Sequence, residues 1–308
     1  MTWARLAFRL QPASIGFAAL LCLGLAGAAG WLTLTMRSML AQCGTSAASD
    51  GCGLIYMFQS PLGEPVMMTQ LGIGVAMYAV PLVLGVPIVT REVEQRTALL
   101  AWPLAGTRLK WLAWRAVPVF VLGLALIGIM AFAAEQLAAA YFPTSDIGFQ
   151  SHGTRGFSLV ARSTFMLAVA VLLGAVIGRL LPALLIGIAL AYGLSTGLDA
   201  LLRSWVEPAR LSESESIQAG VFPLTTGHEY LAPDGTPISD EEGEALYQLV
   251  YEEHGPEPDP SLLPQDVFYG VAASRYGDVL IRESGALLGA TVVATGAAVA
   301  VIARRRPE

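Results

Sequence analysis

Six long stretches of the chain carry no charged residue and consist mainly of apolar side chains. They are residues 15–36, 66–90, 116–134, 163–178, 180–198 and 284–303. A helix needs about 20 apolar residues to cross roughly 30 Å of hydrocarbon, and five of the six stretches come close to or exceed that length. The fourth is shorter, so we expect Arg162 and Arg179 at its ends to extend to the two membrane surfaces. The pattern predicts six transmembrane helices.

The composition agrees with an all-α integral membrane protein. Hydrophobic residues make up 55% of the chain and charged residues only 14%, which is too apolar for a soluble domain. Lipid cannot hydrogen-bond an open backbone, and the sequence lacks the alternation typical of a membrane barrel. The first stretch continues well past residues 26–28, which resemble a cleavage site, so we expect an uncleaved anchor rather than a signal peptide.

Charge is distributed unevenly between the two sides that six spans would define. The side with both termini, the loop 91–115 and Arg179 has a net charge of +8, and the other side has −14, which together make the −6 of the whole chain. Positive residues in short loops mark the cytoplasmic face. We therefore expect a multi-pass plasma-membrane protein with both termini in the cytoplasm, and the near-absence of lysine and asparagine suggests a bacterial source. The tryptophans fit this orientation, with Trp3, Trp102, Trp111 and Trp114 at the inner boundary and Trp31 and Trp205 near the outer one.

This topology divides the chain into three parts. Residues 1–198 form the first five membrane helices, and they begin with an amphipathic segment, 1–11, that suits an interfacial helix or a frayed cationic tail. Residues 199–283 form an acidic, proline-rich extracellular cap, in which Ser239 and Glu242 have the spacing of a helix capping box. A second helix is expected to run from about residue 272 into the last span. Residues 284–308 form the sixth helix and a basic tail.

Most kinds of catalytic or binding chemistry find no support in the sequence. The only lysine, Lys110, is not part of a phosphate-binding loop, and no nucleophile motif is present. His152, His228 and His254 are far apart and have no metal-ligand spacing, so they are interpreted as surface histidines. We expect a protein that is not an enzyme, binds no nucleotide, metal or nucleic acid itself, and contacts membrane lipids.

The spans carry few polar groups. Buried ionisable residues, which ion-driven carriers usually need, are not expected within them, so any energy for transport would come from elsewhere. Gln70 and Tyr78 are the more polar members of the second span and share a helical face. They are weak candidates for a substrate path, and helix-packing contacts are the alternative.

Two cysteines lie in the first outer loop. Cys43 and Cys52 are nine residues apart among small residues, and an oxidising exterior would permit a disulfide between them. The alternative is two free thiols.

The loop 91–115 has an unusual composition. It contains five of the eighteen Lys/Arg residues and three of the six tryptophans, together with Glu92 and Glu94. Glu92 and Arg96 are four residues apart, a favourable pair on a helix. An ordinary topology-determining loop would explain the cations but not the two acids, so we interpret the loop as a docking element for a cytoplasmic partner.

Residues in this loop resemble a pattern of ABC-exporter permease subunits common in actinobacteria and their relatives. Ten positions match: Arg91, Glu92, Glu94, Gln95, Thr97, Leu100, Trp102, Thr107, Arg108 and Trp111. Arg96, Pro103 and Leu104 depart from it. The segment before the last span is similar to a second family pattern at Ala273, Ser274, Arg275, Tyr276 and Glu283, with Gly277 replacing a tryptophan, and 178–190 resembles the turn before span five.

The resemblance implies a six-span permease subunit of an ATP-driven exporter, which pairs with a second copy or a paralogue. Separate cytoplasmic ATP-binding subunits, carrying ATP and Mg, would dock on the loop. Glu92, Glu94, Gln95 and Arg96 would be coupling contacts, beside Arg91 and Thr97, while Trp102, Arg108 and Trp111 would hold the loop at the membrane interface. The competing interpretation is a membrane-anchored sensor or interaction protein whose acidic extracellular loop binds a ligand. The substrate is not readable from the sequence.

Overall fold

The computed structural model describes residues 11–43, 62–95, 97, 107–141, 147–205, 207–211, 222–255 and 258–305. The chain divides into two compact units, and each is described by itself. The first unit comprises Met1–Pro143, Ser151–Asp199 and Val279–Glu308, and the second comprises Thr144–Gln150 and Ala200–Asp278. The expected N-terminal interfacial helix lies outside the described residues.

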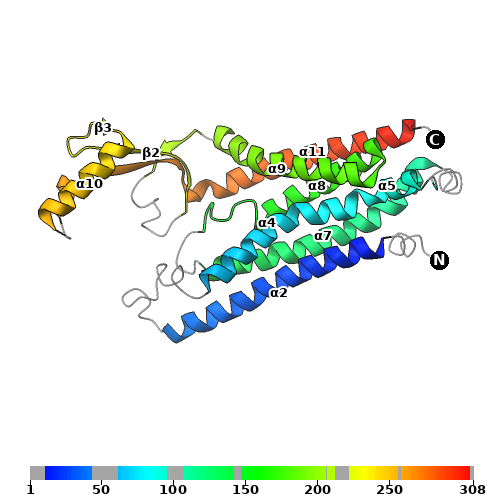
Figure 1. The fold of residues 1–308 in the computed structure, drawn as a ribbon, viewed down its shortest axis with the longest axis horizontal. Coiled ribbons are helices and arrows are strands. Elements are labelled where there is room, and N and C mark those ends of the chain that lie inside the picture. Colours follow the sequence, from blue (N-terminus) through cyan, green and yellow to red (C-terminus); the bar gives the residue numbers. More distant parts are fainter. Residues whose placement is uncertain are drawn as a thin grey trace. The chain divides into compact units, whose positions relative to one another are not determined.

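Helices form most of the described first unit (Figure 1). They are α2 (Pro12–Cys43), α4 (Gly63–Gly85), α5 (Pro87–Glu94), α7 (Arg108–Tyr141), α8 (Gly156–Ile177), α9 (Leu180–Trp205) and α11 (Tyr276–Arg304), of which α9 and α11 also contribute residues to the second unit. Within the part of the chain that the structure describes, six helical segments are long and apolar enough to cross a membrane, with α4 and α5 counting as one of them. The six predicted spans are therefore confirmed.

The core of this unit lies between α2, α4, α7 and α8. Its fully buried side chains include Ile73, Ile127, Met130 and Leu167. Large apolar side chains also point outward from every span, which is expected of helices whose surroundings are lipid rather than water.

Two glycines let α4 and α5 approach α8 closely. A Cβ atom at Gly85 would lie 2.7 Å from the Cβ of Ala170, and one at Gly174 would lie 2.7 Å from the carbonyl oxygen of Val86. Side chains at either position would push the backbones apart, so α8 is packed tightly along the junction of α4 and α5. The junction itself is marked by Pro87, which occupies the first position of α5, where a proline is tolerated because that N–H has no intrahelical acceptor.

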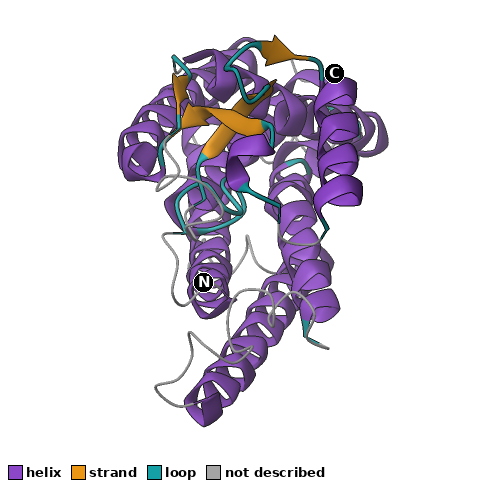
Figure 2. Cartoon of the chain, turned by 90° about the vertical axis from the view of Figure 1, so that its left-hand side faces the viewer, coloured by secondary structure: helices purple, strands orange, loops and turns teal. Residues whose placement is uncertain are grey.

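The second unit contains a four-stranded antiparallel sheet with strand order β1-β4-β2-β3 (Figure 2). The strands are β1 (Ala209–Arg210), β2 (Leu224–Leu231), β3 (Pro237–Ile238) and β4 (Gln265–Val271). No sheet was expected in the acidic loop. Two of the strands have only two residues, and β2 pairs with β4 across about forty positions of sequence, so alternation within short windows could not reveal them.

Helix α10 (Asp240–His254) follows β3 and packs on the sheet through Gly243, which lies against the ring of Tyr230. Its predicted capping box is confirmed, because the Ser239 hydroxyl accepts from the Glu242 N–H while the Glu242 carboxylate accepts from the Ser239 N–H. These hydrogen bonds from Ser239 lower the pKa of the Glu242 carboxyl. A short 3-10 turn, Ala273–Arg275, leads directly into α11, as the sequence predicted for this segment.

Candidate functional site

Residues expected to contact a partner gather around α5 and the start of α7. We call α5, Gln95, Thr97 and residues 108–115 the elbow. Seven of the nine predicted contact residues are described there: Arg91, Glu92, Glu94, Gln95, Thr97, Arg108 and Trp111. Arg96 and Trp102 lie outside the described residues.

Helix α5 has an inward and an outward face. Ile88, Val89 and Glu92 are buried on the inward face, whereas Glu94 and Gln95 are exposed. Burial of Ile88 and Val89 against the core fixes which side of this short helix faces outward. The outward side therefore presents a carboxylate and an amide, and it does not include Glu92.

Glu92 contacts the neighbouring helix of its own chain instead. Its carboxylate forms an ion pair with the guanidinium of Arg115 on α7, and the two side chains are only 10% and 14% exposed. The guanidinium carbon of Arg115 also lies 5.5 Å from the ring centre of Trp111, which is itself buried. This arrangement sets the position of α5 against α7 from the inside.

The start of α7 is held by its own cap and by a contact with α11. The Thr107 hydroxyl accepts a hydrogen bond from the Lys110 N–H at 3.1 Å, as a helix N-cap does. Arg108 Nη1 donates to the carbonyl oxygens of Ala303 at 3.0 Å and Arg305 at 2.6 Å, at the end of α11. Arg108 thus contacts another helix end.

The outward residue Glu94 also reaches the turn between α8 and α9. Its Oε2 accepts a hydrogen bond from the Leu180 N–H at 3.4 Å, at the first residue of α9. A carboxylate is favourable at a helix N-terminus because the first N–H groups lack intrahelical acceptors. The elbow therefore touches the ends of α9 and α11.

The remaining predicted residues are not brought into this site. Tyr78 is buried in the core and Gln70 is half-buried, and a separation of eight helical residues places them about 12 Å apart along α4. Cys43 ends α2 but its side chain is not described, and Cys52 lies outside the described residues, so the disulfide stays a prediction.

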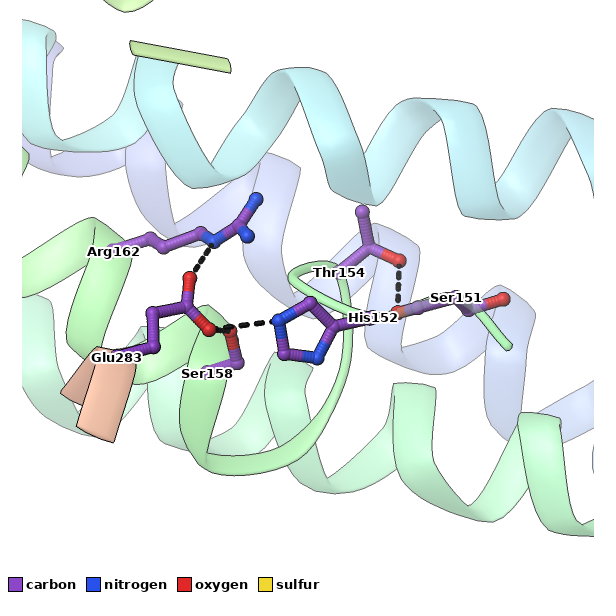
Figure 3. A network of polar contacts seen from close by, with 6 residues as sticks. All are labelled: Ser151, His152, Thr154, Ser158, Arg162 and Glu283. Carbon is purple, nitrogen blue, oxygen red and sulfur yellow. Dashed lines mark hydrogen bonds and ion pairs between the residues drawn. The ribbon is translucent and has the colours of Figure 1, made fainter. Parts of the chain in front are cut away.

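A buried polar cluster joins α8, α11 and the segment before α8 (Figure 3). Glu283 Oε1 lies 2.7 Å from Arg162 Nε, while its Oε2 accepts from the Ser158 hydroxyl at 3.1 Å and lies 2.8 Å from His152 Nε2. Glu283 is 1% exposed and Arg162 is 3% exposed. The positive guanidinium balances the carboxylate where water is excluded.

Two expectations are wrong at this cluster. Arg162 does not extend to a membrane surface, because α8 begins at Gly156 and the guanidinium is paired with Glu283 inside the helix bundle. His152 is not a surface histidine, because its side chain is 8% exposed and lies against Glu283. Buried ionisable groups are therefore present within the helical unit, contrary to the expectation that the spans lack them.

The segment before α8 is shaped to hold this cluster. Gly153 has a φ of +83°, and a Cβ there would lie 2.5 Å from the guanidinium carbon of Arg162. Arg155 Nη1 donates to Glu135 Oε1 of α7 at 2.6 Å, which fixes the same segment from another side. The match of Glu283 to the second family pattern was the one sequence signal for the cluster, and it did not reveal a partner 121 positions away.

Comparison with known proteins identifies the family to which this chain belongs. A family model described as ABC-2 membrane transporter related matches residues 16–203, which is more than half of the chain and spans α2 through almost all of α9. The elbow and Arg162 lie inside the matched range, whereas the sheet and α11 lie beyond it. The chain matches no curated protein and no solved structure. The chain therefore belongs to the ABC-2 membrane transporter related family and is a multi-pass membrane protein of the permease type.

Proposed function

We propose that this chain is the membrane-spanning subunit of an ATP-driven exporter and that separate cytoplasmic ATP-binding subunits dock on the elbow. The chain supplies the translocation path and binds no nucleotide itself, while ATP and Mg belong to the partner. A second copy or a paralogue completes the membrane part. Membership of the ABC-2 family supports this assignment over a membrane-anchored sensor.

The observation that carries the docking role is the two-sided construction of α5. Its inward face is fixed by Ile88, Val89 and the Glu92–Arg115 ion pair, whereas Glu94 and Gln95 are exposed. A short helix held rigidly from inside can pass a force applied to its outer face to the helices behind it. The coupling contacts are accordingly Glu94 and Gln95, with the half-buried Arg91 beside them, and Glu92 positions the helix.

The proposal requires the elbow to face the cytoplasm. We expect a cysteine at position 95, in a variant whose native cysteines are replaced by alanine, to react with a membrane-impermeant maleimide only after the cells are permeabilised. Ser261→Cys in the same background is the control, because Ser261 is exposed in the second unit and should be labelled in intact cells. Labelling of position 95 from outside intact cells would contradict both the orientation and the transporter assignment.

Docking is tested by ATP hydrolysis in lipid nanodiscs. The purified chain should hydrolyse no ATP, and a P-loop ATPase sought among the neighbouring genes should, when added, give hydrolysis that the chain stimulates. The double variant Glu94→Lys and Gln95→Lys should reduce that stimulation roughly tenfold or more, because charge reversal at an interface typically costs a few kcal/mol. Glu64→Lys is the matched control, since Glu64 is an exposed acid in the first turn of α4. Equal stimulation by both variants would exclude the docking role.

A further inference from the structure

Three helix ends meet beside the elbow: arginine side chains donate to carbonyl groups at the ends of α8 and α11, and Glu94 accepts from the first N–H of α9. The last carbonyl groups of a helix have no intrahelical donor, and cations are favourable there. At the end of α11, Arg108 of α7 donates to the carbonyl oxygens of Ala303 and Arg305. A single guanidinium from the elbow thus satisfies one carbonyl in the last turn of α11 and the carbonyl of the residue that follows the helix.

The side chain of Arg305 continues this arrangement to α8. Its Nη1 donates to the carbonyl oxygen of Ala175, in the last turn of α8. The guanidinium lies over Gly178, which ends α8 with a φ of +68° and leaves no room for a side chain. The Arg305 side chain therefore donates a hydrogen bond to α8, while its backbone carbonyl accepts one from Arg108.

The end of α8 in turn contacts the elbow, on the side of α5. A Cβ atom at Gly178 would lie 2.9 Å from Cγ1 of Val93 on α5, so α5 packs directly on the end of α8. Glu94, one residue further, accepts from the N–H of Leu180 at the start of α9. The contacts therefore form a ring. The start of α7 bonds the end of α11, Arg305 after α11 bonds the end of α8, the end of α8 packs on α5, and α5 pairs with α7 through Glu92 and Arg115.

We propose that Arg108 and Arg305 are positioning residues that join the elbow to the ends of α8 and α11, so that these helix ends move as one body with it. The inference rests on the proposed function in one respect, which is that a partner applies force at the elbow. Each guanidinium bonds backbone carbonyls rather than a side chain, so the link does not depend on the rotamer of an acceptor. A displacement of the start of α7 is thereby transmitted to the ends of α11 and α8.

The test measures amide hydrogen exchange by mass spectrometry on the full chain in nanodiscs, without any partner. Arg305→Gln should speed exchange in the last turn of α8 roughly tenfold, because the charged hydrogen bond to the carbonyl oxygen of Ala175 is lost. Arg304→Gln is the matched control, since it removes the same charge from the exposed neighbouring residue of α11. Arg108→Gln should speed exchange at α11, and Arg108→Lys should restore part of the protection.

A second arm adds the ATP-binding subunit with ATP and vanadate. In the unsubstituted chain and in Arg304→Gln, exchange at the ends of α8 and α11 should change together on trapping, and in Arg305→Gln the change at α8 should be lost while the subunit still binds. Identical profiles for Arg305→Gln and Arg304→Gln in the first arm would overturn the inference. If no ATP-binding subunit binds the unsubstituted chain, the proposed function fails, and the partner-free arm still decides the role of the two arginines.

Discussion

Replacing Glu283 by alanine is expected to destabilise the folded chain by about 3–5 kcal/mol, because it leaves the buried Arg162 guanidinium without its counter-charge. The loss also removes the acceptor of the Ser158 hydroxyl and the contact of His152 Nε2. Three residues of the stretch 152–162 would lose their common partner on α11 at once. The change should appear as a large drop in the midpoint of denaturant unfolding of the purified chain in micelles.

Two further variants separate charge burial from loss of volume. Glu283→Gln keeps the shape of the side chain and should still destabilise strongly, because the amide cannot balance the positive charge. Replacing both Arg162 and Glu283 by leucine removes both charges and should recover much of the stability, since an apolar pair of similar volume needs no desolvation of ions. Asp278→Ala is the control, because Asp278 is exposed near the start of α11. If Glu283→Ala and Asp278→Ala unfold alike, the buried pair does not stabilise the fold.

Replacing Glu92 by glutamine is expected to release α5 from α7. The Arg115 guanidinium would keep its stacking on Trp111 but lose the carboxylate that anchors α5. Breaking a largely buried ion pair by removing one partner costs about 3 kcal/mol or more, which corresponds to roughly hundredfold faster local opening. Amide hydrogen exchange of α5 in the full chain measures this opening directly.

Comparison of Glu92→Gln with a variant on the outer face of α5 distinguishes the roles of the two faces. Glu94→Gln is the control, because Glu94 lies two residues further on the same helix and is exposed. The charge swap Glu92→Arg with Arg115→Glu should restore part of the protection, since the pair is re-formed in reverse. Unchanged exchange of α5 in Glu92→Gln would show that apolar packing of Ile88 and Val89 suffices to hold the helix, and the ion pair would lose its positioning role.

The sequence predicted the transmembrane helices well because the signal is local. A run of about 20 residues without charge is visible in a single window, and the structure places a helix over each of the six runs. The capping box at Ser239 and Glu242 could also be predicted from the sequence, since both residues of the motif lie within one turn. The sheet could not be predicted in this way, because β2 and β4 pair across about forty positions of sequence that include α10.

The candidate site shows the same division between local and distant information. The composition of the loop 91–115 pointed to the elbow, yet the sequence could not show that Glu92 points inward, since this depends on where Arg115 lies on the next helix. Arg162 and His152 were misplaced for a similar reason. The neighbours of each residue in sequence indicate an exposed position, whereas Glu283 on α11 determines the environment of both side chains.

The turn between α8 and α9 consists of Gly178 and Arg179 alone. So short a connection leaves no stretch of chain that could wait in water while one helix enters the bilayer and the other follows. We therefore expect the two segments to enter the bilayer together, as a helical hairpin. Arg179 lies in this turn, so its positive charge is expected to stay on the side from which the hairpin enters.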